Sequence, residues 1–164
     1  MLAHVCCLYG FNLNYAKTLV GDLSADQMVE QPGGLVNHPA WSLGHLCVSA
    51  SHLATLLGRE STLPDGWTDT FKTGGVPGGG LVADYPTKDQ LVTMLAALHE
   101  RAVEALKATD PADLEKPHPN EGARKYFPTV GDMAIFLMTG HEMDHLGQIA
   151  AWRRAMGLGS ATGV

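Results

Sequence analysis

The chain has 164 residues, of which 45% are hydrophobic and 17% are charged. This balance is typical of a globular protein and excludes a disordered chain, and the length suits one domain, so we expect residues 1–164 to form a single domain. The formal net charge is -6 at pH 7. An acidic chain is repelled by phosphate backbones, so we do not expect a nucleic-acid partner.

No apolar run in the sequence approaches the roughly twenty residues that a membrane-spanning helix needs. The N-terminal segment contains apolar side chains, but it lacks the basic start of a signal peptide and is interrupted by Asn12, Asn14 and Lys17. We therefore expect a cytoplasmic protein that has no membrane partner.

Four stretches of the chain carry apolar residues at the three-to-four-residue spacing of an amphipathic helix. Helix-starting residues agree with this spacing, because Asn37 can cap the second stretch, Pro39 suits its first turn, and Thr87 can cap the third. Thr129 and Asp132 have the spacing of a capping box at the start of the fourth. We predict helices at about residues 2–20, 39–57, 87–108 and 129–156, the last of them continuous.

Long connections join these predicted helices. Residues 59–86 form a glycine-rich connection of 28 residues, and residues 110–127 form a second long segment. Connections of this length are unusual inside a compact domain, and they favour a bundle that is not simply up-down-up-down. We therefore predict an all-α four-helix bundle with a long crossover connection. The glycine-rich segment either covers one end of the bundle, where it could form part of a pocket, or is partly mobile.

The sharpest local pattern is the string His141-Glu142-Met143-Asp144-His145. Residues four apart share one face of a helix, so the imidazoles of His141 and His145 can bind one metal ion. The string also matches the HExxH pattern of zinc proteases, in which the glutamate is the general base. That pattern usually takes a third ligand from further along the chain, and no His, Asp, Glu or Cys follows His145. A protease is therefore not expected, and a third ligand must lie upstream.

His45 is the best upstream candidate for the third ligand. It lies beside an apolar stripe of its predicted helix, and His141 and His145 are flanked at helical spacing by Leu137 and Ile149. Three buried imidazoles without partners would be costly, whereas one shared metal ion satisfies all three. We therefore predict a divalent metal site on His45, His141 and His145. The alternative is that each histidine makes its own hydrogen bond.

Three further residues are candidates to assist these ligands. Gln148 lies one turn beyond His145 and can hydrogen-bond an imidazole or a bound water, although a polar role in the core fits it as well. His52 lies two turns beyond His45 and is either a fourth ligand, a proton shuttle or a partly exposed histidine. Glu142 is expected to project off the metal face, which favours a surface or helix-neighbour role over a catalytic one.

The remaining histidines are expected to play local roles. We expect His38 to take part in capping at a helix start and His99 to pack or to lie on the surface. His118 lies in a proline-rich loop and is expected to face solvent. We assign none of these three to the metal site.

With these residues in view, the sequence resembles the DinB-like superfamily of metal-dependent helical bundles, which is related to bacterial thiol S-transferases. The resemblance spans nearly the whole chain, and its most specific part is the last segment. The segments that carry it are QPGG at 31–34, NHPAWSLGHL at 37–46 and GHEMDHLGQIAAWRRAMG at 140–157. It implies a four-helix bundle with one long crossover, a three-histidine site for nickel, zinc or a similar ion, and a homodimer. His45, His141 and His145 match the three metal positions of the family.

The residues and the resemblance together predict a metal-dependent enzyme that transfers a low-molecular-weight thiol to a small electrophile. Three imidazoles leave coordination positions open, as in catalytic centres, and nickel or zinc is expected, although iron, cobalt and copper also accept imidazole. Two alternatives stay open. One is a metal-hydroxide hydrolase of small amides or esters, and the other is a non-catalytic bundle that binds a ligand under stress and is stabilised by its metal.

Overall fold

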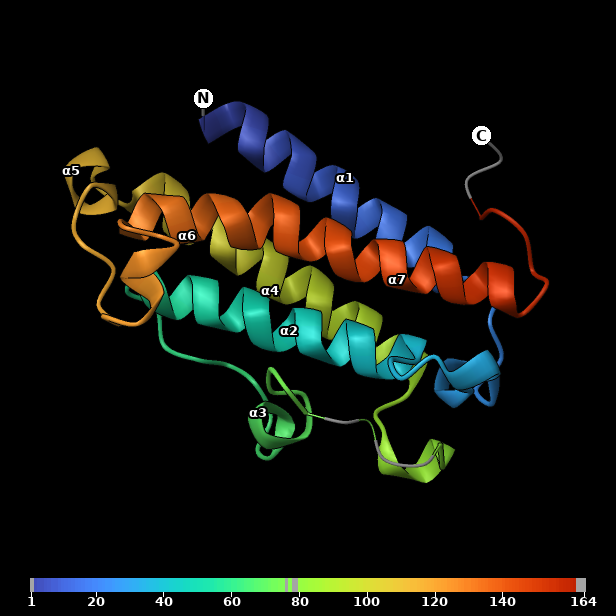
Figure 1. Ribbon diagram of the computed structural model, residues 1–164. Coiled ribbons are helices and arrows are strands. Elements are labelled where there is room, and N and C mark those ends of the chain that lie inside the picture. The colour runs from blue at the N-terminus through green and yellow to red at the C-terminus, as the bar shows by residue number, and fades with distance from the viewer. Residues whose placement is uncertain (1, 76, 78–79, 162–164) are drawn as a thin grey trace.

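Four long helices pack side by side within the part of the chain that the computed structural model describes, residues 2–75, 77 and 80–161 (Figure 1). The same residues contain no strand, so the predicted all-α fold is confirmed. The long helices are α1 (Leu2–Val20), α2 (Pro39–Leu56), α4 (Lys88–Ala108) and a fourth one built from α6 (Val130–Phe136), a π-helical turn (Leu137–His141) and α7 (Glu142–Ala155). The short helices are α3 (Trp67–Thr70) and α5 (Pro111–Leu114), with 3-10 turns at Gln27–Val29, Pro32–Gly34, Val82–Asp84 and Ala123–Lys125.

The helices run in two directions. In Figure 1, α1 and α7 run one way along the bundle, whereas α2 and α4 run the other way. The connection between α2 and α4 must therefore return along the length of the bundle, which confirms the predicted long crossover. The crossover lies against the sides of α2 and α4, where Arg101 of α4 donates to the carbonyl of Glu60 at 2.9 Å and Phe71 is buried. The expectation that it covers one end of the bundle is wrong.

Local capping chemistry sets where the helices begin. Thr87 and Thr129 each cap a helix, as predicted, and both do so in a capping box, which was predicted only for Thr129. The cap of α2 differs from the prediction, because Nδ1 of His38 accepts from the backbone N–H of Trp41 at 3.2 Å. Asn37 is not the cap. Its side-chain amide donates to Oε1 of Gln148 at 2.9 Å and so ties the start of α2 to α7.

The fourth helix is not the continuous α-helix that the periodicity predicts. It follows the predicted path from the cap at Thr129, but the five residues Leu137–His141 form a π-helical turn. A π turn holds one more residue per turn than an α turn and is often found at functional sites. In this chain the turn ends on His141, one of the predicted metal ligands.

The buried side chains form two apolar clusters along the bundle. The first cluster includes Leu19, Leu43, Leu46, Leu91, Leu95, Leu98, Leu146, Ile149 and Trp152. The second includes Val5, Tyr9, Leu53, Ala102, Leu106, Ala134, Leu137 and Met138. On α1, α4 and the fourth helix, the switch from one cluster to the other falls at buried polar residues, namely Asn12, His99 and Glu142.

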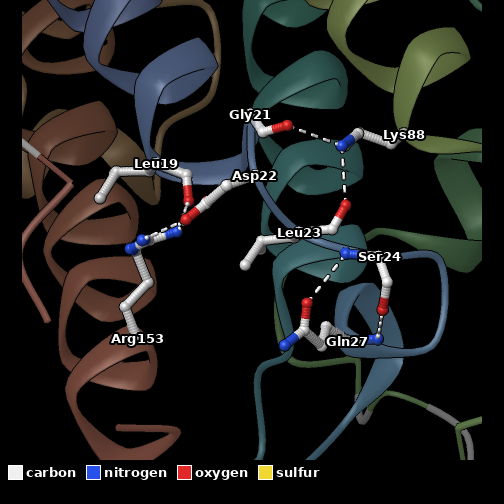
Figure 2. Close-up of polar contacts among 8 residues, drawn as sticks. All are labelled: Leu19, Gly21, Asp22, Leu23, Ser24, Gln27, Lys88 and Arg153. Atoms are coloured by element: carbon white, nitrogen blue, oxygen red, sulfur yellow. Dashed lines mark hydrogen bonds and ion pairs between the residues drawn. The ribbon is translucent and has the colours of Figure 1, made fainter. Parts of the chain in front are cut away.

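Two cations tie the loop after α1 to other helices (Figure 2). The buried guanidinium of Arg153 on α7 bonds both carboxylate oxygens of Asp22, at 2.5 and 2.8 Å. The ammonium of Lys88 at the start of α4 donates to the carbonyls of Gly21 at 3.0 Å and Leu23 at 2.7 Å. Both carbonyls lie just beyond the end of α1 at Val20, so Lys88 supplies a donor to backbone acceptors outside the helix.

Candidate metal centre

Three imidazoles from two helices meet inside the bundle. His45 comes from the middle of α2, His141 from the end of the π turn and His145 from the first turn of α7. One ring nitrogen from each lies within 4.8 Å of the others. His45 and His145 are buried, and His141 is partly exposed. The structure therefore brings together the three residues that the sequence predicts as ligands.

The spacing of these nitrogens suits a metal ion. Nε2 of His45 lies 3.2 Å from Nε2 of His141. An ion about 2.1 Å from each imidazole nitrogen separates two ligand nitrogens by roughly 3.0–3.4 Å in octahedral or tetrahedral geometry. The observed 3.2 Å therefore fits two nitrogens that bind the same ion.

A backbone carbonyl from the crossover fixes the tautomer of His45. Nδ1 of His45 lies 2.7 Å from the carbonyl oxygen of Phe71, and a carbonyl can only accept. Nδ1 therefore carries the proton and Nε2 presents its lone pair toward His141. Such a contact behind a ligand orients the ring and strengthens it as a metal ligand. The phenyl ring of Phe71 is buried against Gly44, the residue before His45.

The electrostatic environment keeps the imidazoles neutral. Burial, together with repulsion from the neighbouring imidazoles, lowers the pKa of His141 and His145 to about 4, although the carboxylate of Asp144 acts in the opposite direction. Burial also lowers the pKa of His45, against the hydrogen bond to Phe71. Metal binding requires the unprotonated imidazole. The three histidines are therefore ready to bind an ion at neutral pH.

Aromatic rings line the centre on two sides. The indole of Trp41, one turn before His45, stacks on that imidazole with centroids 5.1 Å apart and planes at 4°. On the other side, Phe136 meets His141 at 66° with centroids 5.6 Å apart, and Phe127 stacks on Phe136 at 4.5 Å. Apolar walls of this kind limit access of water and hold the ligand rings in place.

Gln148 lies at the polar edge of the centre, near where the sequence predicts it. Its Oε1 accepts from Asn37 and its Nε2 donates to Asp144 at 3.0 Å, so the orientation of its amide is defined. Gln148 also raises the pKa of His145, against the larger effect of burial. The assisting role of Gln148 stays a prediction, and its position is compatible with that role.

The other predicted assistants lie elsewhere. His52 is exposed to solvent on α2, and partial desolvation by its surroundings, together with nearby His118, lowers its pKa. Glu142 is not on the surface, one of its two expected places, because it is 3% exposed; its Oε1 lies 2.5 Å from Nε2 of His99 on the neighbouring helix α4. His118 does not face solvent either and is 3% exposed, with Nδ1 accepting from the backbone N–H of Asn120.

Sequence reasoning missed three residues that shape this region. Phe71 supplies the carbonyl behind His45, Gly44 makes room for the Phe71 ring, and Asn12 on α1 reaches the π turn. The sequence offers little signal for the first, since Phe71 lies in a glycine-rich segment without periodicity. A polar residue inside the apolar stripe of α1 is a signal for Asn12.

These features define an all-α helical bundle with three histidines that can hold a metal ion. A family model described as the DinB superfamily matches residues 11–149. Because this match covers most of the chain, the protein belongs to the DinB superfamily. Neither the curated proteins nor the solved structures compared with the chain gave a match. Among the helices of the described residues, none has the length and apolar character to cross a membrane.

Proposed function

We propose that this protein is a metal-dependent enzyme that transfers a low-molecular-weight thiol to a small electrophile. The observation that carries the proposal is the convergence of three neutral imidazoles with no carboxylate or thiolate among them. A divalent ion on neutral ligands keeps its double positive charge and lowers the pKa of a bound thiol or water. Nickel or zinc fits the imidazole set best, and iron, cobalt or copper is compatible with it.

The residues around the centre have separate tasks in this proposal. His45, with its tautomer set by the carbonyl of Phe71, and His141 and His145 hold the ion. Trp41 stacks on His45 and keeps water from that side. In the transfer the thiol loses its proton to solvent, its sulfur bonds the electrophilic carbon, and the leaving group departs with the electrons of the broken bond.

The test is an assay of the metal-loaded protein with a panel of low-molecular-weight thiols and a chromogenic aryl halide. We expect thiol-dependent product formation that is lost in His145→Ala and retained in His4→Ala, since His4 is exposed on α1. Hydrolysis of small esters or amides without added thiol would point to a hydrolase. No turnover, together with a large fall in melting temperature on chelation, would point to a metal-stabilised binding protein.

Two accompanying expectations concern partners and assembly. A small-molecule substrate is expected, and the homodimer that the resemblance implies stays a prediction. Light scattering coupled to size-exclusion chromatography checks the second point, with an expected mass of twice the 17.5 kDa of the chain. The mass of a single chain would contradict it.

A further inference from the structure

A polar layer crosses the apolar core at the level of the π turn. Asn12 of α1 is 2% exposed, and His99 of α4 and Glu142 of α7 are each 3% exposed. Burial of polar groups costs free energy unless every group is paired, and apolar residues of similar shape are often as stable or more stable. Stability alone therefore does not account for these three polar residues in the core.

Asn12 supplies a hydrogen-bond donor to a backbone carbonyl of the π turn. In a π turn each carbonyl accepts from the N–H five residues later, whereas in an α-helix it accepts from the N–H four residues later. Where the α pattern resumes after the turn, one carbonyl is therefore left without a backbone N–H partner. The N–H of Glu142 bonds the carbonyl of Thr139, and Nδ2 of Asn12 donates to the carbonyl of Met138 at 3.3 Å. Asn12 thus satisfies, from another helix, an acceptor next to the irregular bonding of the turn.

A second contact holds the other side of the turn. Glu142 is the first residue after it, and Nε2 of His99 donates to Oε1 of Glu142 at 2.5 Å. The His99 ring is itself held by Tyr9, on which it stacks with centroids 3.6 Å apart and planes at 8°. The turn is therefore held by α1 through Asn12 and by α4 through His99.

We infer that Asn12 and His99 are positioning residues that hold the π turn and so aim His141 at the metal ion. Each residue advances an α-helix by about 100°, so removal of the extra residue from the turn would rotate His141 and His145 relative to Met138. The contacts of Asn12 and His99 with residues 138 and 142 resist that change. This inference rests on the metal-binding part of the proposed function and is independent of thiol transfer.

The first test is Asn12→Leu, which removes the amide but keeps the size of the side chain. We expect the affinity for Zn²⁺ or Ni²⁺, titrated into metal-free protein, to fall by roughly 10–100-fold, as when contacts behind metal ligands are lost. We expect the metal-free variant to stay folded. The control is Asn14→Leu, the same change at an exposed position of the same helix, which should bind metal like the parent.

A double variant, His99→Phe with Glu142→Met, tests the second contact without leaving an unpaired buried charge. It should also bind metal more weakly, and amide shifts and hydrogen exchange of Gly140 and His141 should change in the metal-free protein. Parent-like metal affinity and amide signals in both variants would overturn the inference. If the parent itself binds no metal, the metal centre fails and the positioning role fails with it.

Discussion

At the scale of single residues, Gly44 decides how closely the crossover approaches the metal centre. A Cβ at this position would lie 2.3 Å from Cε1 of the Phe71 ring, much closer than atoms can approach without a shift. Phe71 is 1% exposed, so its ring has little room to move. The carbonyl of the same residue accepts from His45. The absence of a side chain at position 44 therefore allows the contact that orients a ligand.

We predict that Gly44→Ala lowers both stability and metal affinity. Overpacking of a core typically costs about 1–3 kcal/mol, and displacement of Phe71 would weaken its hydrogen bond to His45. Urea unfolding and metal titration measure the two effects. The control is Gly10→Ala on α1, where an added Cβ meets nothing within 4 Å, and this variant should be as stable as the parent or more so. Parent-like metal binding in Gly44→Ala would contradict the role of Phe71.

The buried histidines predict how the metal-free protein responds to acid. Burial lowers the pKa of His141, His145 and His38 from 6.5 to about 4. Between these values the unfolded chain binds more protons than the folded one, so stability falls as the pH falls from about 6.5 to about 4. The expected loss by pH 5 is on the order of 1–2 kcal/mol per histidine. Urea unfolding of chelated protein at pH 7.5 and pH 5 measures it, and equal stability would contradict it.

The ligands could be predicted at this scale, whereas their surroundings could not. His141 and His145 have helical spacing, and His45 lies beside an apolar stripe, so local periodicity reveals all three. The same periodicity shows that Glu142 points away from the metal face but not which helix it meets. Burial of Glu142 against His99 depends on packing between two helices, and the two residues are 43 positions apart in the sequence.

At the scale of elements, start signals and periodicity predicted the four long helices well. Thr87 and Thr129 lie at helix starts, where each exchanges hydrogen bonds with the residue three positions later. This pairing depends only on neighbouring residues, so the sequence shows it directly. The π turn left no comparable signal, since the apolar spacing of the fourth stretch suits a continuous α-helix. Its contacts come from Asn12 and His99 on other helices.

The ion pair between Asp22 and Arg153 leads to a prediction at the level of elements (Figure 2). Asp22→Ala would leave the buried guanidinium its hydrogen bond to the carbonyl of Leu19, at 2.8 Å. Because the Asp22 side chain is 61% exposed and solvent screens the pair, we expect a loss of only about 1 kcal/mol. Metal affinity should not change. Asp26→Ala, an exposed acid in the same loop, is the control for urea unfolding.

A second measurement checks the same pair. Arg153 lowers the pKa of Asp22, so the pair contributes stability above the usual pKa of a free aspartate, and this contribution is lost as the pH falls through the lowered value. The stability difference between the parent and Asp22→Ala should therefore shrink in strong acid. A difference that is independent of pH, or a loss of metal binding in Asp22→Ala, would contradict the account.

At the scale of the whole molecule, the length of the connections predicted the crossover but not its position. A 28-residue connection is long enough to return along the bundle, and this return lets α2 and α4 run in the same direction. The crossover contacts the metal centre through Phe71, and this contact arises from tertiary packing. The glycine-rich sequence of the crossover has no periodicity from which the contact could be predicted. The crossover is therefore part of the candidate site as well as a connection.

The central claim is that His45, His141 and His145 together bind one divalent ion, and metal content tests it most directly. Mass spectrometry of protein purified without an affinity tag and incubated with Zn²⁺ or Ni²⁺ should give about one equivalent per chain. Each single change to alanine at these histidines should abolish or strongly reduce it, while His4→Ala should retain it. A parent protein that takes up no metal, or alanine variants that keep a full equivalent, would contradict the claim.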